Sequence, residues 1–72
     1  MSLYVLKKIR VEKGITQLQL ANMLKKPQSF ISKYESGERR IDVHEFIYIC
    51  KALQAAPSDV IKDIEKDIKY GL

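Results

Sequence analysis

The side chains that could carry covalent or metal chemistry are few in this chain of 72 residues. It contains one cysteine, Cys50, and one histidine, His44. A nucleophilic thiol needs a neighbouring base, but His44 precedes Cys50 by nearly two turns of a predicted helix. One histidine also cannot form a metal site by itself. We therefore expect no enzymatic activity, no metal and no cofactor, and we expect Cys50 to be a core residue.

The charged side chains indicate a different chemistry, the binding of a polyanion. Residues 1–40 contain nine Lys or Arg and three Glu, whereas residues 41–72 contain four Lys and six acidic residues. A basic first half and a mildly acidic second half suggest that the first half meets nucleic acid and that the second half serves self-association. Ordinary solubilising charge is the alternative explanation.

Short helices would have to position these charges. Apolar residues recur at spacings of three and four rather than in alternation, which predicts an all-α fold. The chain is expected to form one domain over 1–72, because a second core would leave each half too short. Its longest unbroken apolar run, 46–50, is far too short to cross a membrane, and no secretory signal precedes it. We expect a soluble, cytoplasmic protein.

Five helices are expected, at about 3–13, 16–24, 27–35, 42–53 and 57–70. Capping boxes are predicted at Thr16–Gln19 and at Asp42–Glu45. Only Lys25 and Lys26 separate the second helix from the third, so the two must cross steeply, as in a helix-turn-helix at about 16–35. The residues expected to face inward are Leu6, Ile9, Leu20, Ala21, Leu24, Ile31, Tyr34, Val43, Phe46, Ile47, Cys50, Leu53, Val60 and Ile61.

Several spaced features resemble the Cro/C1-type helix-turn-helix of the XRE family. They are Thr16-Gln17, Leu20-Ala21 and Ile31-Ser32-Lys33-Tyr34-Glu35-Ser36-Gly37, together with Arg10, Gly14 and Leu53. The match extends over about 6–64, and agreement among several features is more specific than one short motif. The resemblance implies a five-helix, lambda-repressor-like fold that binds specific double-stranded DNA, usually as a transcriptional repressor. The third helix would enter the major groove.

The third helix would then carry the residues that read bases. With Ile31 and Tyr34 pointing inward, its outer surface is polar, and the family's base-reading positions fall on Pro27, Gln28, Ser29 and Lys33. A glutamine amide can pair with adenine through two hydrogen bonds, so Gln28 is the favoured contact. Lys33 can donate to guanine or to a phosphate. The alternative is that both are solvated surface residues. Phosphate contacts are expected from Gln17, Lys25, Lys26, Ser32, Arg39 and Arg40.

Two positions depart from the family pattern, and one ion pair follows it. Lys25 stands where a turn glycine is common, and a left-handed backbone there costs a lysine about 1 kcal/mol relative to glycine. Pro27 stands where the family prefers a Ser or Thr cap. The resemblance also implies a partly buried ion pair between Arg10 and Glu35, whose role would be to fix the recognition helix.

The second half of the chain contains more apolar surface than a monomer needs, which suggests a homodimer. The residues predicted for its interface are Tyr48, Ile49, Ile64, Ile68 and Leu72. A symmetric dimer would place two recognition helices roughly 34 Å apart on a near-palindromic operator. Two alternatives are a monomer with a long capping helix and a module that binds a protein partner, as an antitoxin or a coactivator does.

Overall fold

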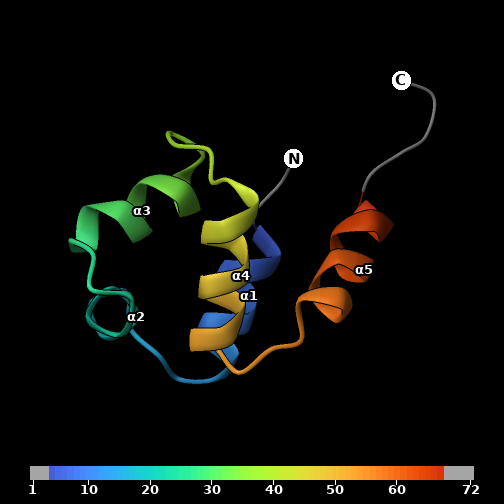
Figure 1. The fold of residues 1–72 in the computed structure, drawn as a ribbon, viewed down its shortest axis with the longest axis horizontal. Helices are drawn as coiled ribbons and strands as arrows, with labels where there is room; N and C mark the ends of the chain where they lie inside the picture. The colour runs from blue at the N-terminus through green and yellow to red at the C-terminus, as the bar shows by residue number, and fades with distance from the viewer. Residues whose placement is uncertain (1–3, 68–72) are drawn as a thin grey trace.

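The computed structural model describes residues 4–67, which form five α-helices and no strand. The helices are α1 (Tyr4–Glu12), α2 (Gln17–Leu24), α3 (Gln28–Ser36), α4 (Val43–Ala52) and α5 (Pro57–Asp67). In Figure 1, α2 and α3 lie to one side of α1 and α4, and α5 lies to the other side. The predicted all-α fold is confirmed. The part of the fifth helix expected beyond Asp67 lies outside the described residues.

Reciprocal hydrogen bonds define where α2 and α4 begin. The Thr16 hydroxyl accepts from the Gln19 backbone N–H at 3.0 Å, and the Thr16 N–H donates to the Gln19 side chain at 2.8 Å. Asp42 and Glu45 form the same arrangement at 2.8 and 3.0 Å. Both predicted capping boxes are confirmed. Each provides partners for backbone N–H groups at the helix start that have none within the helix.

The link between α2 and α3 depends on a lysine with a left-handed backbone. Lys25 has φ 54° and ψ 44°, and its N–H donates to the Asn22 carbonyl at 3.2 Å. The N–H of Lys26 donates to the Ala21 carbonyl at 2.9 Å, which completes the end of α2. Pro27 then precedes α3 without a side-chain cap. The turn therefore keeps its tight geometry although it contains no glycine.

We expect Lys25→Gly to raise the free energy of unfolding by about 1 kcal/mol, because glycine adopts a left-handed backbone without a Cβ clash. Equilibrium urea unfolding of the parent and the variant measures the change. Gln54 also has φ 54°, so Gln54→Gly tests the same effect at a second turn. A less stable Lys25→Gly variant would show that the lysine side chain contributes more than its backbone conformation costs.

Most of the predicted core residues are buried. The buried apolar residues are Val5, Leu6, Leu20, Ala21, Phe30, Ile31, Tyr34, Phe46, Ile49, Cys50, Leu53, Val60 and Ile64. Ile9, Leu24 and Ile47 are partly buried against this cluster. Burial raises the pKa of the Cys50 thiol to about 11, which opposes formation of the nucleophilic thiolate. The Cys50 side chain is therefore part of the core, as predicted.

Two residues predicted to face inward lie at the surface instead. Val43 is 71% exposed because it is the first residue of α4, ahead of the stripe that begins at Phe46. Ile61 is 52% exposed because α5 packs through Val60 and Ile64, which are four residues apart and share one face. Both predictions were wrong. The structure therefore has an exposed apolar residue on each of two neighbouring helices.

Two residues predicted for a dimer interface are buried within the chain itself. Ile49 is 0% exposed, because the inward stripe of α4 includes Ile49 together with Cys50 and Leu53. Its predicted place at an interface was wrong, since no part of it is accessible to a partner. Ile64 is 5% exposed and packs α5 onto the core. Ile68 and Leu72 lie outside the described residues.

Tyr34 has a buried hydroxyl with no hydrogen-bond partner among the described residues. Burial is the largest cause that raises the pKa of this phenol well above its usual value. We expect Tyr34→Phe to raise the free energy of unfolding by about 1 kcal/mol, because it removes an unsatisfied polar group and keeps the ring. Urea unfolding measures this, and Tyr48→Phe, at an exposed position, is the control. A loss of stability would show that the hydroxyl has a partner in solution.

Candidate nucleic-acid interface

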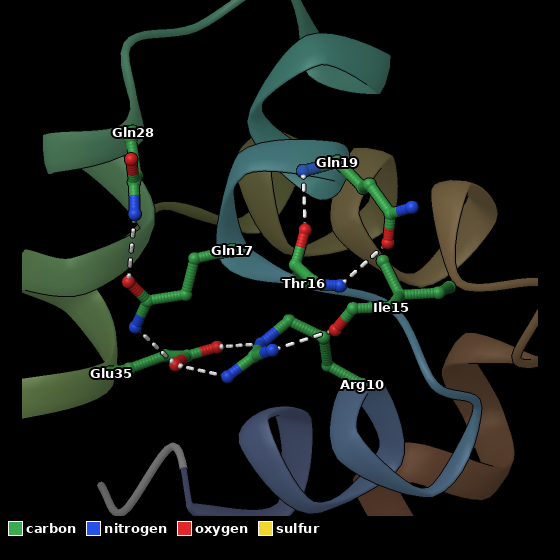
Figure 2. A network of polar contacts seen from close by, with 7 residues as sticks. All are labelled: Arg10, Ile15, Thr16, Gln17, Gln19, Gln28 and Glu35. Atoms are coloured by element: carbon green, nitrogen blue, oxygen red, sulfur yellow. Dashed lines mark hydrogen bonds and ion pairs between the residues drawn. The ribbon is translucent and has the colours of Figure 1, made fainter.

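Polar side chains from α1, α2 and α3 form one hydrogen-bonded network where the three helices meet (Figure 2). Arg10 donates from Nε and Nη2 to the two carboxylate oxygens of Glu35, at 2.7 and 3.0 Å. Its third nitrogen, Nη1, donates to the Ile15 carbonyl at 2.7 Å. Gln17 Nε2 donates to Glu35 Oε1 at 3.0 Å, and Gln28 Nε2 lies 3.5 Å from Gln17 Oε1. The network therefore extends from the interior to the exposed start of α3.

The ion pair in this network is almost entirely removed from solvent. The side chains of Arg10 and Glu35 are 9% and 3% exposed. The pKa of Arg10 is raised, mainly because its guanidinium donates hydrogen bonds to Glu35. Two parallel hydrogen bonds to one carboxylate are the strong form of such a pair. This pair, implied by the resemblance, connects α1 to the last turn of α3 and so fixes the direction of α3.

The outer face of α3 holds the residues predicted to read bases. Phe30, Ile31 and Tyr34 are buried, which turns the opposite side of the helix outward. That side presents the exposed residues Gln28, Ser29 and Lys33, with exposed Pro27 just before them. Ser32 is half-buried, and its hydroxyl donates to the Ser29 carbonyl at 3.2 Å. The structure thus gathers all four predicted base-reading residues on one surface.

Arg39 makes contacts that the sequence analysis did not predict. Its guanidinium donates to Glu45 from Nη1 at 3.2 Å and from Nη2 at 3.0 Å, and it lies 4.6 Å from the centre of the Phe30 ring. The hydrogen bonds between the two side chains raise the pKa of Arg39 and are the largest cause that lowers the pKa of Glu45. Arg39 therefore contacts both α3 and α4 while its side chain remains 42% exposed.

The basic residues predicted to contact phosphate lie in two different places. Lys26, Lys33 and Arg39 surround a shallow hollow of about 290 Å³ over Phe30, beside the reading face of α3. The Lys26 ammonium is 5.6 Å from the centre of the Phe30 ring. Lys25 instead lines a larger hollow between α2 and α4, at the opposite end of α2 from Gln17. Lys26 lines both hollows, so positive charge extends from beside the reading face to this second surface.

Residues 4–67 contain no group of three or more His, Cys, Asp or Glu side chains that could hold a metal ion. None of α1 to α5 combines the length and apolar character that crossing a bilayer requires.

Comparison with known proteins gives matches over most of the chain. Residues 6–60 match the helix-turn-helix family. An XRE-family like protein from Pseudomonas syringae pv. tomato str. DC3000 is 41% identical, with a TM-score of 0.81 over 89% of this chain and 78% of that one. The restriction-modification controller protein C.Esp1396I is 32% identical, with a TM-score of 0.81 over 88% and 83% of the two chains.

A more distant structure shares the fold. The clp gene regulator ClgR from C. glutamicum is 24% identical, with a TM-score of 0.85 over 94% of this chain and 88% of that one. A search of curated proteins gave no match.

Proposed function

The chain belongs to the XRE family of helix-turn-helix proteins, a family of DNA-binding transcriptional regulators, and we propose that it reads DNA by placing α3 in the major groove. One observation carries this proposal. The exposed face of α3 holds hydrogen-bonding side chains, while its other face is fixed by the core and by the Arg10–Glu35 pair. A rigid helix with a polar outer face can place side chains against base edges reproducibly.

Gln28 is the residue that we assign to adenine. Its amide can donate to N7 and accept from N6 of that base, which is a two-bond match. The chain of contacts through Gln17 to Glu35 limits the conformations of the Gln28 side chain before DNA arrives, which favours binding. Ser29 and Lys33 would contact neighbouring bases, with guanine the preferred partner of Lys33, and Pro27 would lie against the same groove.

Phosphate contacts would hold α3 in its groove. Gln17 lies at the start of α2, where backbone N–H groups and the helix dipole favour an anion. Lys26, Ser32, Arg39 and Arg40 would complete the contacts on the same side of the molecule. Lys25, unlike Lys26, does not line the hollow beside the reading face, so it is not assigned to this surface. Occupation of a promoter in this way excludes other proteins, so we propose repression as the outcome.

We also propose that two copies bind together to a near-palindromic operator. Val43 and Ile61, both exposed, border an apolar groove of about 380 Å³ between α4 and α5, over Phe46 and Ile64. A second copy that packs the same face against it would bury Val43 and Ile61 through a two-fold axis. Sedimentation at micromolar concentration should show the dimer, and Ile61→Ser should shift it to monomer. A parent chain that sediments only as monomer would reject this arrangement.

The test of the proposed function is selection from a random DNA pool at moderate salt. Anisotropy titrations then compare the enriched site with a scrambled one. We expect a palindrome that binds at least about a thousandfold more tightly than the scramble, as specific DNA-binding proteins do. No enrichment, or equal affinity for both sites, would reject sequence-specific regulation.

We expect Arg40→Ala to weaken binding to the enriched and scrambled sites by similar factors. Loss of one phosphate contact should reduce the slope of log affinity against log salt by about 0.9. Titrations at several salt concentrations measure this slope. Lys62→Ala, at an exposed position on α5, is the matched control and should leave the slope unchanged. An unchanged slope for Arg40→Ala would place Arg40 outside the interface.

A further inference from the structure

A second groove lies between the C-terminal end of α2 and α4. It shares Lys26 and Phe30 with the hollow beside the reading face of α3, and it shares no lining residue with the α4–α5 groove. This α2–α4 groove has a volume of about 590 Å³. Its apolar floor is formed by the partly buried Leu24 and Ala52, which lie over the buried Phe30 and Ile49. Met23 and Tyr48, which are 53% and 62% exposed, form its sides. Met23 and Tyr48 are therefore large, exposed side chains at this groove that are not part of the core.

The charges around this groove have one predominant sign. Lys25, Lys26 and Lys51 line it together with a single acidic residue, Glu45. That carboxylate already accepts two hydrogen bonds from Arg39, which partly offset its negative charge toward a ligand. An occupant of the α2–α4 groove thus meets an apolar floor bordered by positive charge.

We propose that the α2–α4 groove binds an acidic amphipathic segment of a protein partner. The apolar face of such a segment would lie between Met23 and Tyr48, and acidic side chains beside it would meet the lysines. Methionine adapts to the shape of a bound apolar group, and tyrosine offers a rigid apolar surface with a polar tip. The structure thus contains the two features that recognition of an acidic helix requires.

The charge pattern also argues against a second copy of the chain in this groove. A symmetric contact would bring the same three lysines of both copies together, and like charges oppose such a contact. The groove starts at Met23 and Leu24 in the last turn of α2, roughly 9 Å along the helix from Gln17. Gln28, Ser29 and Lys33 do not line it, so the partner would leave the reading face of α3 free and would share only Lys26 with the phosphate contacts.

The test uses the full chain, labelled with ¹⁵N, and two synthetic peptides of about 15 residues, long enough to form a helix on binding. Both peptides contain leucine at helical spacing; one has glutamate at its other positions and the other has lysine. We expect the acidic peptide to shift the amide signals of Met23, Lys25, Tyr48 and Lys51, with an affinity that falls as salt rises. The basic peptide should leave these signals unchanged.

Matched variants separate this site from the DNA-binding surface and from the proposed dimer face. Tyr48→Ser and Lys51→Glu should each lower the affinity for the acidic peptide by about tenfold. Both variants should bind the enriched DNA as tightly as the parent does. Ile61→Ser, in the α4–α5 groove, should bind the peptide normally. A circular dichroism spectrum like that of the parent shows that the variants are folded without relying on DNA binding, so this proposal and the proposed function can fail independently.

Three results would overturn the proposal. They are the absence of shifts with the acidic peptide, equal binding of the basic peptide, and shifts centred on Val43 and Ile61. Concentration-dependent shifts of Met23 and Tyr48 without any peptide would identify a second copy as the occupant, which would also overturn it.

Discussion

Replacing Glu35 with glutamine is expected to lower the free energy of unfolding by about 3 to 5 kcal/mol, a large part of the stability of so small a protein. The substitution leaves the Arg10 guanidinium, 9% exposed in its side chain, without an anionic partner. It also removes one of the oxygens that accept from Arg10 and Gln17. Urea unfolding followed by circular dichroism measures the loss.

Two further variants make this result interpretable. Glu38→Gln, at an exposed position near the end of α3, should leave the stability unchanged. The double variant Arg10→Met, Glu35→Leu should recover most of the loss, because it removes the desolvation cost of the pair together with the pair itself. Together with the single variants Arg10→Met and Glu35→Leu, the double variant gives the coupling energy of the pair. A Glu35→Gln variant as stable as the parent would mean that the pair is solvated in solution.

The second large effect concerns sequence discrimination. We expect Gln28→Ala to lose about 1 to 3 kcal/mol of preference at one base pair of the enriched site, roughly ten- to a hundredfold. Affinity for scrambled DNA should stay the same, since phosphate contacts determine it. Anisotropy titrations on the enriched site and on its single-base-pair variants measure both quantities.

The control for this experiment is another amide on the neighbouring helix. Asn22 is exposed on α2 and lies outside the reading face, so Asn22→Ala should keep the full preference. If Gln28→Ala weakened binding equally on all sequences, Gln28 would contact the DNA backbone instead of a base.

Local features were the most predictable from the sequence. The capping boxes at Thr16–Gln19 and Asp42–Glu45 depend on residues three positions apart, so they form whenever a helix starts there. The inward faces of α2 and α3 follow from spacings of three and four, and the outward polar face of α3 follows from them. This is why the predicted base-reading residues are found on one surface.

The features that were missed depend on tertiary geometry. α4 is apolar nearly all round, so its periodicity alone does not say that Ile49 packs inward and that Val43 lies at the surface. The Arg39–Glu45 pair depends on the path of the chain between α3 and α4, which spacing does not determine. The contact of Gln17 with Glu35 joins residues from two helices and requires their crossing angle. These three features are determined by how the helices pack together, so they could not be predicted from residue spacing.

The outward-facing residues of α3 differ in how strongly the fold constrains them, and this affects how the protein can change the DNA sequence that it binds. The side chains of Ser29 and Lys33 point outward and make no hydrogen bond or ion pair within the described chain, so folding places little constraint on their identity. New DNA sequences could be addressed by exchanging these two residues on an unchanged scaffold. Gln28 is less free to vary, because it contacts Gln17 and through it the carboxylate of Glu35. Retargeting should therefore begin at Ser29 and Lys33, and relatives with diverged operators should differ there first.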